Sequence, residues 1–421
     1  PPFPLPLPPR PPRPRTLAAC GLIPVYWTRE SQEVIDVQLH SRTADIQISG
    51  IRKFTELVKR YPDAISLTIG QPHFPTPQHI REAAQRAIAE GYTVYTPNRG
   101  ELALRQAVAA YYQRLLGHDY QPDSEILVTV GATHALDIAM RTLLQPGDEV
   151  IVPAPAYPGY EGIVTLMGAK TVYVDTARDG FRLTPEALAG ALSARSKILI
   201  LASPANPTGV QYSRADVEAL ASVLRGTDVW VISDEIYAEL SFAKEPVTSI
   251  ATVDGMRERT VVIQGLSKSH SMTGWRIGFT LAPANLTDEF VKVLQYSVTC
   301  ASSVSQHAAL EAMRHGADDA RPMREAYRRN RDRVVETFRR LGIPLVEPTG
   351  AFYAFPHIAA ALGMDSQTLC DRLLSEARVA IIPGDAFGPH GEGYARLSYA
   401  CDEGVLDEAL RRIETFVQSR M

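Results

Sequence analysis

Short runs of apolar, β-branched residues alternate with stretches of helical spacing through the middle of the chain. The stretches between the runs are long enough to cross over from one parallel strand to the next. The pattern therefore predicts an α/β fold with a mostly parallel seven-stranded sheet and helices on both faces. An earlier helix is predicted over residues 48–60, before Pro62. The predicted strands are Ile126–Val130, Val150–Val152, Thr171–Val174, Ile198–Leu201, Val229–Ser233, Thr260–Ile263 and Ile277–Leu281.

The same pattern divides the chain into parts. Residues 1–40 are rich in proline and arginine, so they predict a disordered extension, with a polyproline ligand for a partner domain as an alternative. Residues 41–75 are expected to form an N-terminal arm and part of a small domain, and residues 76–311 a large domain. Residues 312–421 begin with a charged helix and are expected to complete the smaller α+β domain.

The composition is that of a globular enzyme. The 421 residues include 43 Lys and Arg against 47 Asp and Glu, and the net charge of −4 gives no reason to expect a nucleic acid partner. No apolar run is long enough to predict a membrane span. Cys20, Cys300, Cys370 and Cys401 are scattered without a C-x-x-C pair. They favour a reducing compartment, the cytoplasm, and predict neither a disulfide framework nor a metal site.

Chemically capable residues follow several of the predicted strands. Gly131 begins a turn into a helix, whose free N–H groups can hold a phosphate. Asn206, Asp234 and Lys268 follow three further strands, with Tyr237 close behind Asp234. Each has an ordinary alternative: a tight turn, a structural salt bridge or a solvated lysine. Because the carboxyl ends of parallel strands share one edge of a sheet, we expect these side chains to lie together.

Together these residues match the needs of one cofactor. A buried lysine can form a Schiff base with an aldehyde, and an aspartate can keep a pyridine nitrogen protonated. Asn and Tyr side chains can hydrogen-bond a phenolate oxygen, and a helix N-terminus can bind a phosphate. The set predicts pyridoxal 5'-phosphate.

Seven motifs in a fixed order carry a family resemblance: Gly70-Gln71-Pro72, Tyr95-Thr96-Pro97, Pro204-Ala205-Asn206-Pro207-Thr208-Gly209, Ser233-Asp234-Glu235-Ile236-Tyr237, Ser267-Lys268, Gly274-Trp275-Arg276-Ile277-Gly278 and Arg396-Leu397-Ser398. From about Asp45 to the C-terminus, the sequence resembles the fold-type I, class I and II aminotransferases. Residues 46–54 and 265–279 are most similar to the branch of that family named for N-acetyl-LL-diaminopimelate.

The resemblance implies roles around the cofactor ring. Lys268 would bind the cofactor's aldehyde and then carry the proton during transfer, which requires a pKa lowered by a dry, cationic pocket. Asp234 would pair with the ring nitrogen. Asn206 and Tyr237 would bind the ring oxygen, and Tyr157 would stack on the ring.

It also implies how the phosphate is held. Ala132, Thr133, Ser267 and Arg276 would bind it within one subunit, and the planar guanidinium of Arg276 suits an oxyanion. Tyr95 would reach the phosphate of the neighbouring subunit, so the resemblance implies a homodimer.

The activity implied is transamination between an L-amino acid and a 2-oxo acid by a ping-pong mechanism. Arg396 would clamp the substrate α-carboxylate, helped by Gly70 and Asn206. N-acetyl-LL-diaminopimelate, aromatic and aspartate-type donors all stay open, with 2-oxoglutarate or glutamate as partner. The sequence does not place the residues on which side-chain specificity would depend, such as Ile48, Gly50, Arg99 and Tyr353.

Two other functions remain open. A pyridoxal-phosphate-dependent carbon–sulfur β-lyase would use the same cofactor machinery, because one scaffold hosts several chemistries. A pyridoxal-sensing regulator would carry a DNA-binding helix-turn-helix, for which residues 1–40 are too rich in proline. His270 follows Lys268 closely but is given no role.

Overall fold

The computed structural model describes residues 42–48 and 50–421, so the predicted extension of residues 1–40 lies outside the described residues. The strands are β1 (Ile65–Ser66), β2 (Ile126–Thr129), β3 (Glu149–Ala154), β4 (Lys170–Asp175), β5 (Ser196–Ala202), β6 (Trp230–Asp234), β7 (Thr260–Gly265), β8 (Gly278–Leu281), β9 (Tyr353–Ala354), β10 (Val379–Ala380), β11 (Ile382–Pro383) and β12 (Ala395–Ser398).

The helices are α1 (Gly50–Val58), α2 (Gln78–Ala89), α3 (Leu102–Leu116), α4 (Gly131–Leu143), α5 (Gly159–Leu166), α6 (Pro185–Ala191), α7 (Arg214–Leu224), α8 (Leu266–Ser269), α9 (Ala284–Ser297), α10 (Ser303–His315), α11 (Ala320–Arg340), α12 (Ile358–Ala361), α13 (Ser366–Ala377) and α14 (Glu403–Gln418). Within the described ranges, none of them has the length and apolar character needed to cross a membrane.

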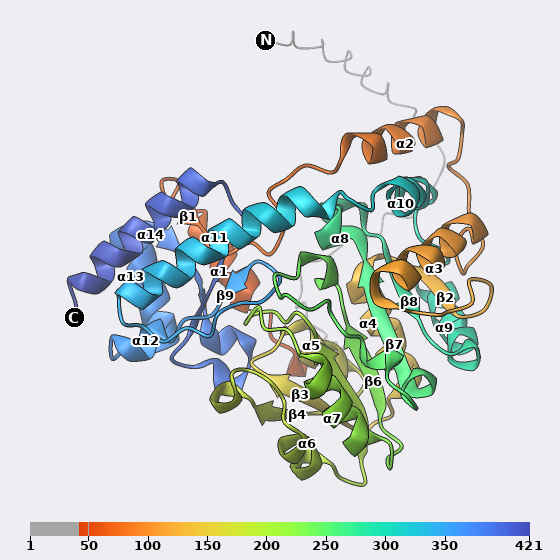
Figure 1. Cartoon of the computed structure of the whole chain (residues 1–421), viewed down its shortest axis with the longest axis horizontal. Coiled ribbons are helices and arrows are strands. Elements are labelled where there is room, and N and C mark those ends of the chain that lie inside the picture. The colour runs from red at the N-terminus through yellow and green to blue at the C-terminus, as the bar shows by residue number, and fades with distance from the viewer. Residues whose placement is uncertain (1–41, 49) are drawn as a thin grey trace, which may run out of the picture. The chain divides into compact units, whose positions relative to one another are not determined.

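A seven-stranded sheet forms the centre of the fold, in the order β2-β8-β7-β6-β5-β3-β4 (Figure 1). The pairs from β4 through β7 are parallel, whereas β8 is antiparallel to both β7 and β2. β8 therefore runs against the other six strands. The mostly parallel sheet predicted from the sequence is confirmed.

Helices cover both faces of this sheet, as predicted. One face packs its apolar side chains against α4, α5 and α9. The opposite face packs against α3 and α10 at the β2 end and against α6 and α7 at the β5 end. Because both faces are covered, the central strands are buried along most of their length. Burying each large aliphatic side chain contributes about 1.5–3 kcal/mol to folding, which explains the continuous apolar runs.

Four observed strands, β3, β4, β5 and β7, are longer than the apolar runs that predicted them, whereas β2 and β8 are one residue shorter and β6 is shifted by one residue. β3 begins at Glu149, whose carboxylate accepts hydrogen bonds from Ser193 and Arg195. β6 ends at Asp234, which is buried at the edge of the sheet. Glu149 and Asp234 are held at their strand ends by such partners, so hydrophobicity alone does not include these two residues in the strands.

A smaller α+β part is built from both ends of the described chain, as predicted. β1 pairs in parallel with β10, and β11-β12-β9 form an antiparallel sheet. α11, α13 and α14 lie together beside these strands (Figure 1). The exact domain boundaries at residues 75 and 311 stay a prediction.

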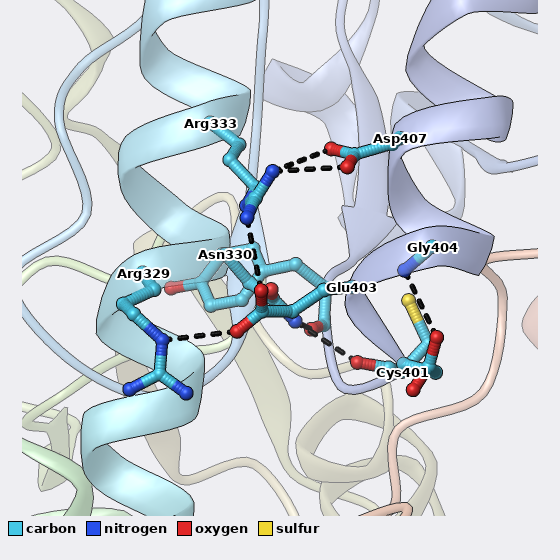
Figure 2. Close-up of polar contacts among 9 residues, drawn as sticks. Arg329, Asn330, Arg333, Cys401, Glu403, Gly404 and Asp407 are labelled. Carbon is cyan, nitrogen blue, oxygen red and sulfur yellow. Dashed lines mark hydrogen bonds and ion pairs between the residues drawn. The ribbon is translucent and has the colours of Figure 1, made fainter.

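Polar contacts fasten α11 to the start of α14 (Figure 2). Arg329 and Arg333 both bind Glu403, and Arg333 also binds Asp407. Asn330 is fully buried, and its amide donates to the carbonyl oxygens of Tyr399 and Cys401. These two residues follow β12, so the contacts also fix the exit of the strand that carries Arg396.

Candidate functional site

A cavity of about 350 Å³ lies at the carboxyl ends of β5, β6 and β7, a volume in the range of small-molecule sites. The structure brings eleven predicted site residues together around it, namely Gly70, Ala132, Thr133, Tyr157, Asn206, Asp234, Tyr237, Ser267, Lys268, Arg276 and Arg396. Three of them are cationic and one is a carboxylate. The cavity is therefore suited to an anionic ligand.

Lys268 lies on the short helix α8, directly after β7. Its Nζ donates a 2.6 Å hydrogen bond to the carbonyl oxygen of Gly70. Burial lowers the pKa of Lys268 to about 8, and the positive charges of Arg396 and Arg276 contribute, against the opposite effect of Asp234. A substantial fraction of the amine is therefore neutral near physiological pH, as a nucleophile or proton carrier needs.

Asp234 is the last residue of β6 and is buried. The hydroxyl of Tyr160 donates to its Oδ2 at 2.6 Å, and the backbone N–H of Ile236 donates to Oδ1 at 3.3 Å. Burial raises the pKa of Asp234, and these two hydrogen bonds oppose the shift. The carboxylate can therefore accept a further hydrogen bond from a donor in the cavity.

A tight glycine turn forms the other end of the cavity. α4 begins at Gly131, which has a φ of +78°, and the guanidinium of Arg276 packs against it. A Cβ on Gly131 would lie 2.5 Å from Arg276 Nη2, and a Cβ on Gly278 would lie 2.7 Å from the Ala132 nitrogen. Only glycine allows this approach of the arginine to the helix N-terminus, where N–H groups and cation can bind one oxyanion.

The side chain of Arg276 reaches this place from a left-handed backbone, with φ at +52°. Such a conformation costs a non-glycine residue of order 1 kcal/mol and is concentrated at functional sites. Its Nη1 also donates to the carbonyl oxygen of Thr273 at 2.9 Å. Ser267 and Thr133 line the cavity nearby.

Arg396 is buried on β12 and also lines the cavity. Its Nη2 donates to the Thr68 carbonyl oxygen at 2.6 Å, and its Nη1 to Asn206 Oδ1 at 3.1 Å. Its guanidinium lies over the rings of Tyr353 and Phe387, at 4.5 and 4.9 Å from their centres. Each η nitrogen uses one of its two hydrogens in these contacts, so the guanidinium, which lines the cavity, keeps donors for a ligand.

Two tyrosines that the sequence analysis did not place in the site complete it. Tyr160 binds Asp234, and its position three residues after Tyr157 at the start of α5 is the signal that could have revealed it. Tyr353 lines the cavity, and its hydroxyl shares a 2.9 Å hydrogen bond with that of Tyr237. The Tyr237 hydroxyl is thus held in place before any ligand binds.

Other named residues lie elsewhere. Tyr95 is 84% exposed and does not line this chain's cavity, so its predicted role in a neighbouring subunit stays a prediction. Arg99 binds Asp288 outside the cavity. Ile48 is exposed, and His270 is buried against Ser269 and the carbonyl oxygen of Gly316.

Comparison with known proteins agrees with this geometry. The model of one protein family, described as aminotransferase class I and II, matches residues 62–413. A Bacillus subtilis (strain 168) protein named "Probable N-acetyl-LL-diaminopimelate aminotransferase" is 51% identical over 90% of this chain and 95% of its own. A solved aromatic aminotransferase from Pyrococcus horikoshii OT3 has a TM-score of 0.83 at 39% identity, covering 87% of this chain and 99% of its own. An aspartate aminotransferase from Thermus thermophilus, solved with maleate, has a TM-score of 0.83 at 37% identity, covering 89% and 98%.

Proposed function

The chain belongs to the class I and II aminotransferases, and on this premise we propose that it uses pyridoxal 5'-phosphate to move an amino group from an L-amino acid to a 2-oxo acid by a ping-pong mechanism. The observation that carries the proposal is Lys268. Its amine lies in a cavity that also contains a buried carboxylate and a buried guanidinium, and its pKa is lowered to about 8. These are the properties required of an amine that captures an aldehyde and then moves protons.

The residues around the cavity fit the cofactor chemically. The Gly131 turn and Arg276 suit its phosphate, and Asp234 suits a protonated ring nitrogen. When bound, the cofactor supplies an electron sink that stabilises negative charge on the substrate's Cα. The second hydrogens on the two η nitrogens of Arg396 leave donors for the substrate rather than for the cofactor.

In this proposal each side chain around the ring has one task. Lys268 Nζ leaves the Gly70 carbonyl oxygen and carries the proton that departs from the substrate's Cα. Asp234 would accept a hydrogen bond from the ring nitrogen. Asn206 and Tyr237 would bind the ring oxygen, and the aromatic ring of Tyr157 would pack against the ring and exclude water.

The phosphate would be held by backbone N–H groups at Ala132 and Thr133, by Ser267 and by Arg276. Tyr95 of a neighbouring subunit would complete this phosphate-binding site. An exposed apolar surface formed by Tyr92, Val94, Tyr95, Tyr296 and Val298 supports a homodimer, because large apolar side chains in one region are typical of an interface. This surface comes from two segments of the chain, which are joined next to it by a 2.8 Å hydrogen bond from the Asn98 amide to the Thr299 carbonyl oxygen.

Arg396 would bind the substrate's α-carboxylate, with Asn206 and Gly70 beside it. Identity of 51% to the B. subtilis relative supports N-acetyl-LL-diaminopimelate as the first donor to test, with glutamate and 2-oxoglutarate as the partner pair. Aromatic and aspartate-type donors are next to test, because the similar solved structures are an aromatic and an aspartate aminotransferase. Free thiols at Cys300, Cys370 and Cys401 support a cytoplasmic location.

The test is an absorption spectrum of the purified protein with pyridoxal phosphate, followed by addition of single amino acids. We expect a visible band that is lost when a donor converts the cofactor to its amine form and returns when a 2-oxo acid is added. Lys268→Ala should abolish the covalent band, whereas Lys292→Ala, an exposed lysine on α9, should not. Release of pyruvate and ammonia from cystathionine without a 2-oxo acid would instead identify a lyase. A band that no donor changes would identify a sensor.

A further inference from the structure

A second buried carboxylate, Glu235, directly follows Asp234 but does not line the cavity. Its side chain is 1% exposed. Because successive side chains of an extended strand point to opposite sides, Asp234 faces the cavity and Glu235 faces the interior behind it. Neither the predictions from sequence nor the proposed reaction assigns a task to this residue.

Four side chains donate hydrogen bonds to Glu235. Ser233 binds Oε1 at 2.7 Å, and Ser249, from the segment before the central strand β7, binds the same oxygen. Gln264 Nε2, on β7, binds Oε2 at 3.2 Å. His118 Nε2, from the segment after α3, binds Oε2 at 3.0 Å. A buried carboxylate with its lone pairs satisfied in this way is an anchor, because losing any donor would leave a charge under-solvated.

The anchor joins the two strands whose ends carry the reacting groups. The backbone N–H of Glu235 donates to the carbonyl oxygen of Ile263 at 3.1 Å, so the main chains of β6 and β7 are also tied at this level. Asp234 precedes the anchor by one residue on β6. Lys268 follows Gln264 by four residues, at the end of β7.

We propose that Glu235 is a positioning residue, which fixes the ends of β6 and β7 so that the Asp234 carboxylate and the Lys268 amine are held in register with the cofactor. The inference rests on the proposed pyridoxal phosphate function. It adds a residue that touches neither cofactor nor substrate and acts through Asp234 and the β7–α8 connection.

The negative charge of Glu235 also supports the role of Asp234, because, together with burial, it raises the pKa of that carboxyl group. Burial opposes its ionisation, but the hydrogen bonds from His118 and the two serines outweigh burial and lower the pKa of Glu235. The resulting negative charge adds to burial in raising the pKa of Asp234. A more basic Asp234 is a stronger partner for a protonated ring nitrogen.

The test compares Glu235→Gln with Glu239→Gln. Glutamine keeps the shape and one acceptor oxygen at position 235, replaces the other oxygen by an NH2 donor, and removes the charge. Glu239 is also buried, and it accepts a 2.6 Å hydrogen bond from Tyr111 of α3 rather than from a strand of the sheet. For each protein we would measure the unfolding temperature without cofactor, the Kd for pyridoxal phosphate, and the pH midpoint of the visible band.

We expect Glu235→Gln to weaken cofactor affinity about tenfold and to lower the pH midpoint, since a negative charge near the protonated form is lost. Glu239→Gln should leave the Kd for pyridoxal phosphate within about twofold of wild type and the pH midpoint unchanged, while lowering the unfolding temperature similarly. If Glu235→Gln changes only the unfolding temperature, its role is structural and the inference is wrong. If wild type shows no visible band, the proposed function itself fails.

A second variant covers the case in which Glu235→Gln does not fold. Gln264→Met removes the donor on β7 but keeps the volume and the Glu235 charge. It should weaken pyridoxal phosphate binding at least about threefold, because β7 loses its side-chain link to β6. Unchanged affinity and an unchanged pH midpoint in this variant would overturn the positioning role.

Discussion

Replacing Arg396 by lysine tests the proposed substrate clamp while keeping the positive charge. The two η nitrogens of the arginine each donate one hydrogen, to Asn206 and to the Thr68 carbonyl oxygen, and each keeps a second hydrogen for a ligand. Its planar fork can give a carboxylate two parallel hydrogen bonds, whereas a lysine amine is a point donor. The variant should therefore lose at least one charged hydrogen bond to the substrate.

A hydrogen bond to a charged group contributes about 1.5–3 kcal/mol, so kcat/KM for an amino acid should fall by about 10- to 100-fold. The assay is the loss of the cofactor's visible band in single-turnover mixing with a donor amino acid. Pyridoxal phosphate affinity should stay within about twofold of wild type, because Arg276 rather than Arg396 packs against the Gly131 turn proposed to hold the phosphate.

The matched control is Arg331→Lys, on α11. Arg331 is similarly enclosed, 11% exposed, and donates to the Pro348 carbonyl oxygen at 2.7 Å, but it does not line the cavity. It should leave kcat/KM unchanged. A loss of less than about threefold in Arg396→Lys would refute the clamp, and so would an equal loss of cofactor affinity.

Three further predictions follow from other contacts. The rate at which cofactor-free protein captures pyridoxal phosphate should rise with pH through about 8 and then level off, because only the neutral Lys268 amine attacks; stopped-flow absorbance measures it. His79→Gln should lower stability most below pH 6.5 and progressively less as pH rises, because hydrogen bonds to Glu311 and Asp319 outweigh burial and raise the pKa of His79; denaturation at several pH values measures it. Gly278→Ala should weaken cofactor binding by displacing the Gly131 turn, whereas Gly274→Ala, whose Cβ meets nothing within 4 Å, should not.

Much of the fold could be predicted from hydrophobic pattern alone. The seven apolar runs are seven strands, because each central strand is buried on both faces. The direction of β8 could not be predicted, since a buried strand has the same composition whether it runs parallel or antiparallel. Nor could strand ends such as Glu149, which depend on polar partners far away in the chain.

The site was predictable wherever a reactive side chain follows a strand. Asn206, Asp234 and Lys268 come together because parallel strands end at one edge. Gly70 and Arg396 meet them through β1 and β12 of the smaller part, a proximity that only the motif order suggested. Tyr160 and Glu235 were missed, because a tyrosine on a helix and a buried acid usually have structural explanations.

Because Asp234 and Glu235 are adjacent, the number of residues in β6 decides which of the two carboxylates faces the cavity. Inserting or deleting one residue within β6 would turn Glu235 toward the cavity and Asp234 toward the four donors, exchanging two carboxylates that differ by one methylene. β6 is paired on both sides, with β5 and β7, so a bulge cannot absorb the change without breaking a ladder. The connection before β6 can therefore change in length, but the count of residues must be kept within the strand and onward to Glu235 and Tyr237, which directly follow it.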